Sequence, residues 1–389
     1  MNVCMFSPFS TKASCTRRLI SFAKELIRRG HTVSITLPSF DRHSGFTLET
    51  VENFDGIKLS HPFQLKVRKM EVATFSYTLS SSLSSLFLRC DIIHVLKPTP
   101  ITWAGYLGKI LYGTPIIQDI DDLDHAVMIA EKHPKMRIWF MRQSEKLLPK
   151  LADYVVTCSS LLKRIYIDLG VEQDKITWIP QGVNVSEFEV KSDLSIKAKY
   201  NLRDKVVVYL GALNNDVQVY PLIKAMKLII AKRKDVSCLI IGDGSARSFY
   251  ERLVHNLGLG EFVAFTGFVP HEDVPKLLSI SDIGFACFVP PLIPTGGLMK
   301  VFEYMASRVP VVVNQSGDLP YYIDYGKAGA ITKLDPESLS STLIQLLDDD
   351  RKRKKMGKHA YEYVKENFDW KILTEQLIRI YKSAQARMR

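Results

Sequence analysis

The sequence predicts an α/β protein made of two doubly wound parallel sheets. Short apolar segments alternate with helical segments along the chain, which is the pattern of parallel strands joined by covering helices. The alternation stops near residue 185 and then restarts. The chain has 389 residues, which is more than one hydrophobic core usually supports. We therefore expect two Rossmann-like domains, residues 1–185 and 186–369.

The first half opens as strand, helix and strand. Residues 16–29 have helical spacing, and Gly30 ends that helix before the second strand. Ser159 or Ser160 is expected to cap a later helix. A Pro/Gly turn at 178–183 closes this half, and the polar stretch 185–200 is expected to be the linker. The expected strands are residues 3–7, 33–37, 92–95, 115–120 and 154–158.

The second half repeats the alternation and ends in a long helical tail that begins at Pro336. The expected strands are residues 205–210, 237–241, 262–265, 283–288 and 309–314. The expected helices are residues 221–233, 246–257, 271–279 and 300–307.

Composition limits the class of protein. The chain is 46% hydrophobic and 24% charged, as in globular proteins, and no run of eighteen apolar residues could cross a bilayer. The amino terminus lacks the features of a secretory signal, so we expect a cytoplasmic protein. The six cysteines lack the spacing of a metal site, so free thiols and no bound metal are expected.

The net charge of +11 favours an anionic partner. No zinc-finger, RNP or bZIP pattern is present, so no nucleic acid is expected. Lys135–Arg142 alternates basic and large apolar residues at helical spacing. This pattern suits docking on an anionic membrane leaflet, such as the inner face of the plasma membrane. An amphipathic helix packed on the core explains it nearly as well.

Ligands of doubly wound sheets bind beyond the carboxyl ends of the strands, so the loops after strands are the candidate sites. The most informative loop contains Gly296 and Gly297 directly before an amphipathic helix. Two glycines allow the backbone to approach a phosphate closely. The first N–H groups of the helix, near Leu298 and Met299, would point at that anion.

Two charged residues follow in the same helix. Lys300 lies in the first turn and can add a full positive charge, and Glu303 can accept hydrogen bonds from vicinal ribose hydroxyls. The segment therefore predicts a nucleotide-binding site. A helix that simply begins after a glycine turn, with solvated Lys300 and Glu303, explains the same residues.

This segment, followed by residues 309–313 and 317–320, resembles the donor-binding region of the retaining glycosyltransferases of the GT-B fold, family 4. Weaker matches occur in the family's order along the whole chain. They are Gly30-His31, Asp91-Ile-Ile-His94, residues 179–183, 209–213, 240–244, 265–270, Lys276-Leu-Leu, Asp282-Ile and Met356-Gly357.

The resemblance implies two Rossmann-like domains that face each other across a cleft, with the final helix, residues 370–389, packed back on the first domain. It implies transfer of a sugar from a UDP- or GDP-linked donor with retained anomeric configuration, without a metal or other cofactor. The implied acceptors are saccharides and lipid-linked saccharides, as in polysaccharide biosynthesis.

The resemblance also assigns roles to donor-site residues. Glu303 matches the second glutamate of the family's E-x7-E pattern and would hold the ribose, and Gly211 belongs to a matching donor-site motif. Thr295 stands where the first glutamate is expected, so it can hydrogen-bond a sugar hydroxyl but supplies no carboxylate. Ala212 and Val217 stand in place of the cationic diphosphate clamp, and Lys224 is a neighbouring cation that could compensate for it or not. In the first domain, the family's glycine pair aligns with Ala13-Ser14.

The family's histidine after strand 115–120 aligns with Asp121 in the run 119–124. Asp121 or Asp122 could orient the sugar or accept the proton of the acceptor, as that histidine is thought to help do. Turn-forming surface carboxylates explain the run almost as well. A divalent cation on this cluster stays open as a further alternative.

Three competing interpretations remain. A catalytically degenerate relative could bind a nucleotide sugar, glycan or partner subunit without turnover, as the substitutions at 212, 217 and 295 suggest. Asp119-x-Asp121 with residues 241–244 mimics haloacid-dehalogenase-like phosphatases, but Ser245-Ala-Arg247 supplies no carboxylate for magnesium. A nicotinamide dehydrogenase is weaker still, because no G-x-G-x-x-G follows the first strand.

Overall fold

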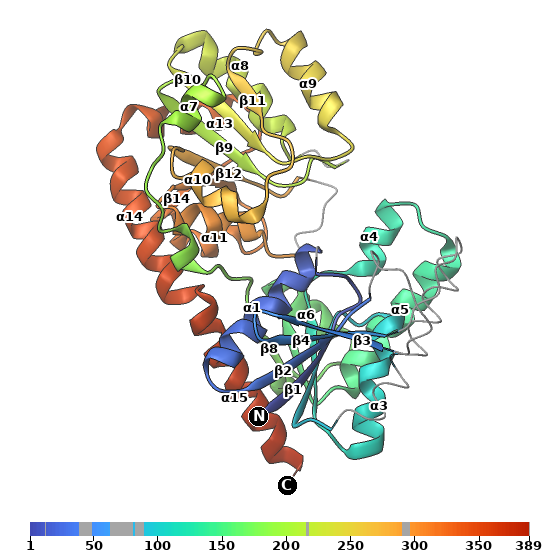
Figure 1. Cartoon of the computed structure of the whole chain (residues 1–389). Coiled ribbons are helices and arrows are strands. Elements are labelled where there is room, and N and C mark those ends of the chain that lie inside the picture. Colours follow the sequence, from blue (N-terminus) through green and yellow to red (C-terminus); the bar gives the residue numbers. More distant parts are fainter. Residues whose placement is uncertain are drawn as a thin grey trace. The chain divides into compact units, whose positions relative to one another are not determined.

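The structure is a computed structural model that describes residues 1–11, 13–38, 49–62, 81, 89–214, 218–289 and 296–388. The chain forms two compact units, coloured along the sequence in Figure 1. The first unit consists of Met1–Gln181, Thr295–Gly297 and Trp370–Arg389. The second consists of Gly182–Pro294 and Leu298–Asp369. The first division falls after Gln181, four residues before the boundary expected from the sequence.

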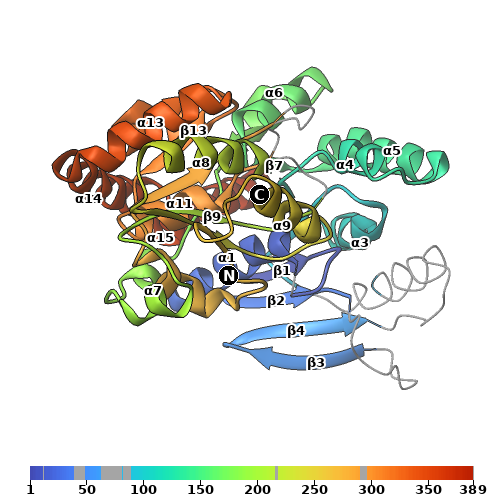
Figure 2. The ribbon, with the colours of Figure 1, turned by 90° about the horizontal axis from the view of Figure 1, so that it is seen from above.

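The first unit contains an eight-stranded sheet in the order β3-β4-β2-β1-β5-β6-β7-β8. The pairings are parallel except for β3 with β4, which form an antiparallel ribbon at one edge (Figure 2). Its strands are β1 Asn2–Phe6, β2 Thr32–Thr36, β3 Glu49–Phe54, β4 Ile57–Pro62, β5 Ile92–Leu96, β6 Ile116–Ile120, β7 Tyr154–Thr157 and β8 Ile176–Trp178.

The helices of this unit follow the sequence pattern. Gly30 adopts a left-handed φ of 79° just after α1, and the Ser159 hydroxyl caps α6 by accepting from Leu162 N. The helices are α1 Ser14–Arg28, α3 Trp103–Tyr112, α4 Asp124–Ala130, α5 Lys135–Leu151, α6 Ser160–Asp168 and α15 Trp370–Met388, with short 3₁₀ turns η1 Pro100–Thr102 and η2 Gln173–Lys175.

The last helix, α15, is part of the first unit. Trp370, Leu373 and Leu377 are buried in one core with residues of β1 and α1. The Trp370 ring meets Phe22 of α1 edge-on, with 5.0 Å between ring centroids. Burial of these large side chains supplies the hydrophobic free energy that holds α15 against α1.

The second unit contains a six-stranded sheet in the order β11-β10-β9-β12-β13-β14, in which every described pairing is parallel. The strand order reverses between β9 and β12, so this unit is doubly wound. The two sheets confirm the predicted fold class. The strands are β9 Lys205–Leu210, β10 Val236–Ile241, β11 Val263–Phe265, β12 Ile283–Ala286, β13 Val311–Asn314 and β14 Gly329–Thr332.

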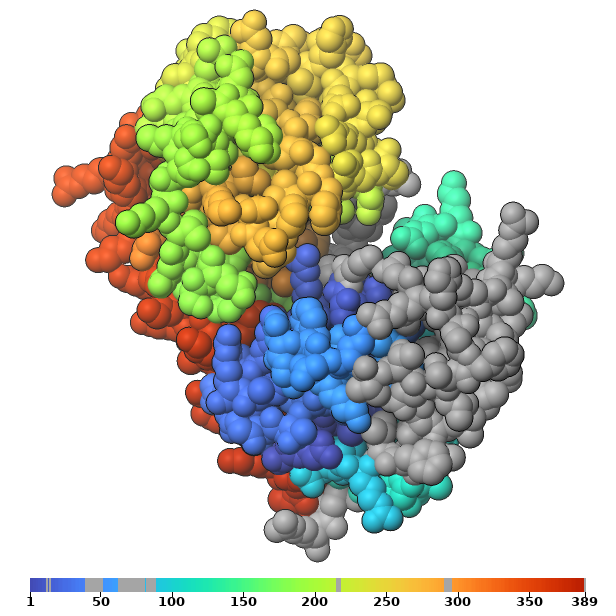
Figure 3. Space-filling model, viewed as in Figure 1, coloured from blue at the N-terminus to red at the C-terminus, as the bar shows by residue number. Residues whose placement is uncertain are grey.

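Its helices cover both faces of this sheet, as expected for strands that are buried on both sides. On the face drawn in Figure 3, the surface of this unit is formed largely by its first half, coloured green to orange. The helices are α7 Ser195–Lys199, α8 Tyr220–Lys232, α9 Arg247–Asn256, α10 Val274–Leu278, α11 Met299–Ala306, α12 Leu319–Tyr322, α13 Pro336–Asp348 and α14 Asp350–Asn367, with 3₁₀ turns η3 Val185–Phe188, η4 His271–Asp273 and η5 Asp324–Gly326.

Two expectations about helices were wrong. The polar stretch 185–200 is not a bare linker, because it contains η3 and α7. The helical tail is interrupted at Asp349, ahead of the final helix expected at 370–389, because Asp349 ends α13 and caps α14 by accepting a hydrogen bond from Lys352 N. Arg353 then donates to the last carbonyls of α13, at Leu346 and Leu347.

In the part of the chain that the structure describes, no helix is both long and apolar enough to cross a bilayer.

Candidate functional site

Lys300 lies at the carboxyl end of β9, at the point where the strand order of the second unit reverses. Gly211, with φ +148°, follows β9 directly, and a Cβ atom there would lie 2.6 Å from Lys300 Nζ. The ammonium also lies 4.2 Å from the centroid of the Tyr209 ring and 3.4 Å from Gln218 Oε1. A side chain at position 211 would displace this ammonium, which lies at the strand end where doubly wound sheets bind ligands.

Tyr304 fixes α11 on the sheet. Its hydroxyl accepts a hydrogen bond from Leu210 N at 2.7 Å and donates to Phe285 O at 3.3 Å, which joins the ends of β9 and β12. Its ring lies so close to Gly284 that a Cβ there would be 2.5 Å from the ring. The helix register is thus set by a buried side chain. This register places Lys300 beside Gly211 at the carboxyl end of β9, and Glu303 one turn further along α11.

Glu303 is buried, and its Oε1 lies 2.8 Å from Nε2 of His271. His271 begins η4 in the segment that follows β11. Sequence reasoning missed His271, although it follows the matched segment 265–270 directly. A buried carboxylate needs a hydrogen-bond donor, so a donor near Glu303 was foreseeable, but its position in the chain was not.

The glycine loop before α11 is described only in part. Thr295 and Val217 lie outside the described residues. Gly296 and Gly297 belong to the first unit, and a Cβ atom on Gly296 would lie 3.5 Å from Asp121 O. Leu298 has an extended backbone and Met299 begins the helix, one residue earlier than expected.

Lys300 therefore lies in the first turn of α11, where the helix dipole favours anions. Ala212 is exposed directly after Gly211. Lys224, considered as a substitute for the missing cationic clamp, lies on α8 with its ammonium 5.4 Å from the ring centroid of Tyr220.

In the first unit, Asp119 is completely buried at the carboxyl end of β6. Arg18 Nε donates to Asp119 Oδ2 at 2.7 Å, and His94 Nε2 lies 3.3 Å from the same oxygen. Burial alone would raise the pKa of Asp119, but Arg18 and His94 together hold this pKa below the usual value. His94 also meets the Tyr381 hydroxyl at 2.6 Å. Because Asp119 is completely buried and held by Arg18 and His94, its carboxylate is not exposed to a substrate, which argues against the phosphatase interpretation.

Asp121 and Asp124 share one buried cation that sequence reasoning missed. Lys97 follows β5 with a left-handed φ of 60°, and its Nζ lies 3.1 Å from Asp121 Oδ1 and 2.7 Å from Asp124 Oδ1. Burial raises the pKa of Asp121 in spite of Lys97, and burial raises that of Asp124 to about 6. These carboxylates are not the solvated turn residues that the simpler interpretation expected.

Asp122 differs from its neighbours because it is only half-buried. Its Oδ1 accepts a hydrogen bond from Leu123 N at 2.8 Å. A Cβ atom on Gly296 would lie 3.9 Å from its Oδ2. Within the described ranges, no group of three His, Cys, Asp or Glu side chains is arranged to hold a metal ion.

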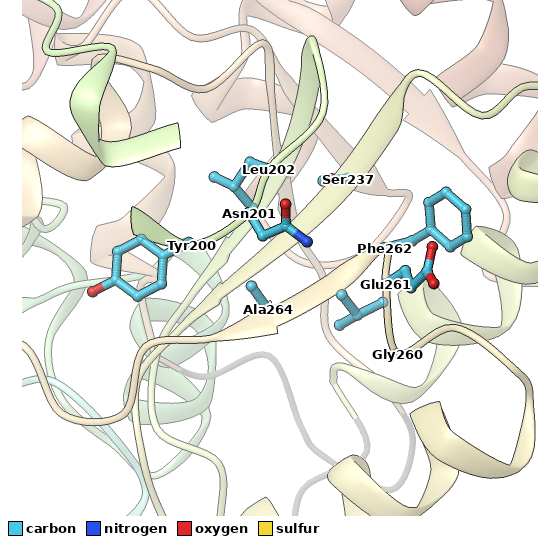
Figure 4. Close-up of a pocket in the computed structure, with 9 residues that line it drawn as sticks. Tyr200, Asn201, Leu202, Ser237, Gly260, Glu261, Phe262 and Ala264 are labelled. Carbon is cyan, nitrogen blue, oxygen red and sulfur yellow. The ribbon is translucent and has the colours of Figure 1, made fainter. Parts of the chain in front are cut away.

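A small pocket in the second unit lies at the wrong end of the strands for the predicted ligand (Figure 4). Asn201 precedes β9, Ser237 lies at the start of β10, and Val263 begins β11, so the pocket borders the amino ends of these strands. Open parallel sheets bind ligands beyond the carboxyl ends. We therefore assign no role in donor binding to this pocket.

Two protein families match the chain in tandem. The family described as Glycosyltransferase Family 4 matches residues 16–187, and the one described as Glycosyl transferases group 1 matches residues 191–363. Together the two matches span most of the sequence. The chain therefore belongs to the GT-B glycosyltransferases of family 4, a family of transferases.

Individual relatives are distant. Spore coat protein SA of Bacillus subtilis is 28% identical over 233 residues, which are 57% of this chain and 59% of that protein. The GDP-mannose-dependent monoacylated alpha-(1-6)-phosphatidylinositol monomannoside mannosyltransferase of Corynebacterium glutamicum is 28% identical over 272 residues, 66% of this chain and 70% of that one. Anabaena Alr3699/HepE, solved with UDP, superposes with a TM-score of 0.74 at 16% identity, over 98% of this chain and 100% of that one. This structural likeness shows the shared fold.

Proposed function

We propose that this protein transfers a sugar from a nucleotide-sugar donor to a saccharide or lipid-linked saccharide, with retention of the anomeric configuration. One observation carries the proposal. Lys300 and Glu303 lie one turn apart on α11, at the reversal point of the second sheet, with Lys300 Nζ over Gly211. A cation for a diphosphate and a carboxylate for a ribose are thereby fixed on one short helix.

The demanding step is departure of the nucleoside diphosphate. Negative charge grows on the diphosphate as the glycosidic bond breaks, and a positioned cation lowers the free energy of that state. Lys300 supplies the cation, and the amino end of α11 adds the positive end of its dipole. With Ala212 and Val217 in the clamp positions, Lys300 takes a larger share of this stabilisation than its counterparts in the family do.

We propose a UDP- or GDP-linked donor and no resident metal or cofactor. The support comes from similar proteins, since the Corynebacterium relative is named as GDP-mannose-dependent and the Anabaena structure contains UDP. In the first unit, we propose that Asp121, held by Lys97, orients the donor sugar. The half-buried Asp122 is then the better placed of the two carboxylates to accept the proton of the acceptor.

We further propose that the first unit acts at the inner, anionic face of a membrane, from the cytoplasm. The segment Lys135–Arg142 on α5 has no buried residue, so it does not pack on the core. Met136, Trp139 and Phe140 are 68%, 54% and 52% exposed at helical spacing, and exposed basic residues flank them. Exposed aromatic and basic side chains on one helix match the chemistry of an anionic lipid surface.

The activity is tested by measuring transfer and donor hydrolysis with UDP-, GDP- and ADP-sugars, with and without EDTA. We expect turnover with one nucleotide class, retained configuration in the product, and no loss with EDTA. Nucleotide binding without turnover for every donor would favour the non-catalytic alternative. Loss of turnover with EDTA, restored by a divalent cation, would overturn the proposal of metal independence.

The membrane contact is tested by sedimentation with vesicles of phosphatidylglycerol and phosphatidylcholine. We expect binding that grows with the anionic fraction and falls several-fold in Trp139→Ala. Phe249→Ala is the matched control, because Phe249 is an exposed aromatic residue on α9 of the second unit. Equal binding of the wild type and Trp139→Ala would contradict the assignment of this surface.

A further inference from the structure

We infer that His271 is a positioning residue for the donor ribose, which it serves by fixing the carboxylate of Glu303 before the nucleotide binds. The inference rests on the proposed function, since it takes Glu303 as the ribose acceptor. It adds a residue that neither the family pattern nor the sequence analysis assigns. His271 does not need to touch the ligand for this role.

The geometry fixes the imidazole from two sides. His271 Nε2 lies 2.8 Å from Glu303 Oε1, and the ring of Phe188 meets the imidazole edge-on with 6.1 Å between ring centroids. Phe188 is itself buried at the end of η3. The histidine is therefore held by an aromatic wall on one side and by the carboxylate on the other.

The contact joins two segments of the second unit that are distant in sequence. His271 comes from the segment after β11, at one edge of the sheet, whereas Glu303 comes from α11, which follows β12. The Glu303 side chain is 7% exposed and that of His271 is 33% exposed. A carboxylate so deeply buried needs a donor, and in the described part of the chain His271 supplies it.

The hydrogen bond leaves Glu303 able to bind a diol. A carboxylate has about four acceptor positions, and His271 uses one of those on Oε1. Within the described residues, no hydrogen bond is assigned to Oε2 of Glu303. A carboxylate with a fixed orientation loses less side-chain entropy when it binds the two ribose hydroxyls, so its contribution to affinity is larger.

This role predicts a specific dependence on the ribose hydroxyls. Without His271, the Glu303 side chain loses conformational entropy when a ligand binds to it. This loss weakens only the binding of ligands that contact the carboxylate. A nucleotide without the 2′ and 3′ hydroxyls should bind equally well to the wild type and to the variant. A general weakening of the fold would affect both nucleotides alike.

The experiment is calorimetric titration of the full-length protein with UDP, GDP and ADP, followed by the 2′,3′-dideoxy form of the tightest binder. For the natural nucleotide, we expect Glu303→Ala to weaken binding by about tenfold or more and His271→Ala by about three- to tenfold. For the dideoxy form we expect neither variant to differ from the wild type. His271→Gln keeps an N–H donor and should restore most of the affinity.

The outcomes separate this inference from the proposed function. If Glu303→Ala discriminates between the two nucleotides but His271→Ala does not, the positioning role is overturned and the ribose site stands. Equal losses in His271→Ala for both nucleotides would also overturn it, because they indicate a structural role. If no nucleotide binds the wild type, or Glu303→Ala affects both forms equally, the proposed donor site itself fails. Thermal unfolding of each variant reports whether the fold is intact.

Discussion

The charged groups at the carboxyl ends of the strands are surrounded differently in the two units. In the first unit, Asp119 is paired with Arg18, and Asp121 and Asp124 share Lys97, so each of these three buried carboxylates has a cation from the protein itself. In the second unit, the Lys300 ammonium lies against the Tyr209 ring and the Gln218 amide oxygen. Both of these contacts of Lys300 are made with neutral groups.

The difference has a functional meaning. Arg18 and Lys97 neutralise buried carboxylates and so serve the fold, whereas Lys300 lies at the carboxyl end of β9, where a doubly wound sheet binds its ligand. We therefore take the first two cations as structural and propose the third as the cation that meets the diphosphate. Four substitutions test this contrast, and they are ordered by the size of the expected effect.

Arg18→Ala should have the largest effect on stability. It leaves the completely buried Asp119 without its partner, and breaking a buried ion pair in this way costs about 3–5 kcal/mol. Denaturant unfolding monitored by circular dichroism measures the change. Lys24→Ala on the same helix is the control, because the side chains of Lys24 and its partner Asp55 are 35% and 60% exposed and their pair should be worth less than about 1 kcal/mol. Similar losses in both variants would contradict the structural assignment of the Arg18–Asp119 pair.

Lys300→Ala should lower kcat by about 10²- to 10³-fold with little change in stability, because it removes the cation that stabilises the leaving diphosphate. Steady-state kinetics with the active donor checks this. Lys224→Ala provides the comparison, since Lys224 is the other cation considered for the diphosphate. If Lys224→Ala is the more damaging substitution, the clamp lies on α8 and our assignment is wrong.

Asp124→Asn should change how stability depends on pH. Burial raises the folded-state pKa of Asp124 to about 6, above its unfolded value of about 4, so the folded protein binds this proton more tightly. The stability that this proton contributes is complete below pH 4 and is lost as the pH rises through 6. Between pH 4 and 7.5 the unfolding free energy of wild type should therefore fall relative to Asp124→Asn, by on the order of 1–3 kcal/mol. A difference that is constant over this pH range would contradict the shift.

Tyr381→Phe should have the smallest effect. It removes the hydroxyl that contacts His94 Nδ1 but keeps the ring of α15 in the core, so the expected loss is about 1 kcal/mol. Thermal or chemical unfolding is sufficient to measure it. A loss of several kcal/mol would mean that the network around Asp119 extends through α15 as one cooperative unit.

Much of the fold could be predicted from the sequence. Apolar runs and helical periods identified the central strands to within one or two residues, because strands that are buried on both faces need continuous apolar sequence. The antiparallel ribbon of β3 and β4 was missed, because its edge strands lack such runs. The break at Asp349 in the helical tail was missed because this cap lies in the acidic run 348–350, where each residue could serve equally well.

The candidate site was predicted unevenly. Motif spacing placed Lys300 and Glu303 on the correct helix, because both are local to one segment. Their partners could not be predicted in the same way. Lys97 contacts Asp121, which is 24 residues further along the chain. His271 contacts Glu303, which is 32 residues further along. Only the order of the strands in the sheet brings such positions together. A residue whose role depends on a tertiary contact leaves no local pattern in a single sequence.

The central claim is that the second unit binds a nucleoside diphosphate at the carboxyl ends of β9 and β12. A crystal structure of the protein with the tightest-binding of UDP, GDP and ADP tests it most directly. We expect diphosphate oxygens within hydrogen-bond distance of Lys300 Nζ, beside Gly211, and ribose hydroxyls on Glu303. A diphosphate bound elsewhere, such as in the pocket beside Asn201 and Ser237, would contradict it.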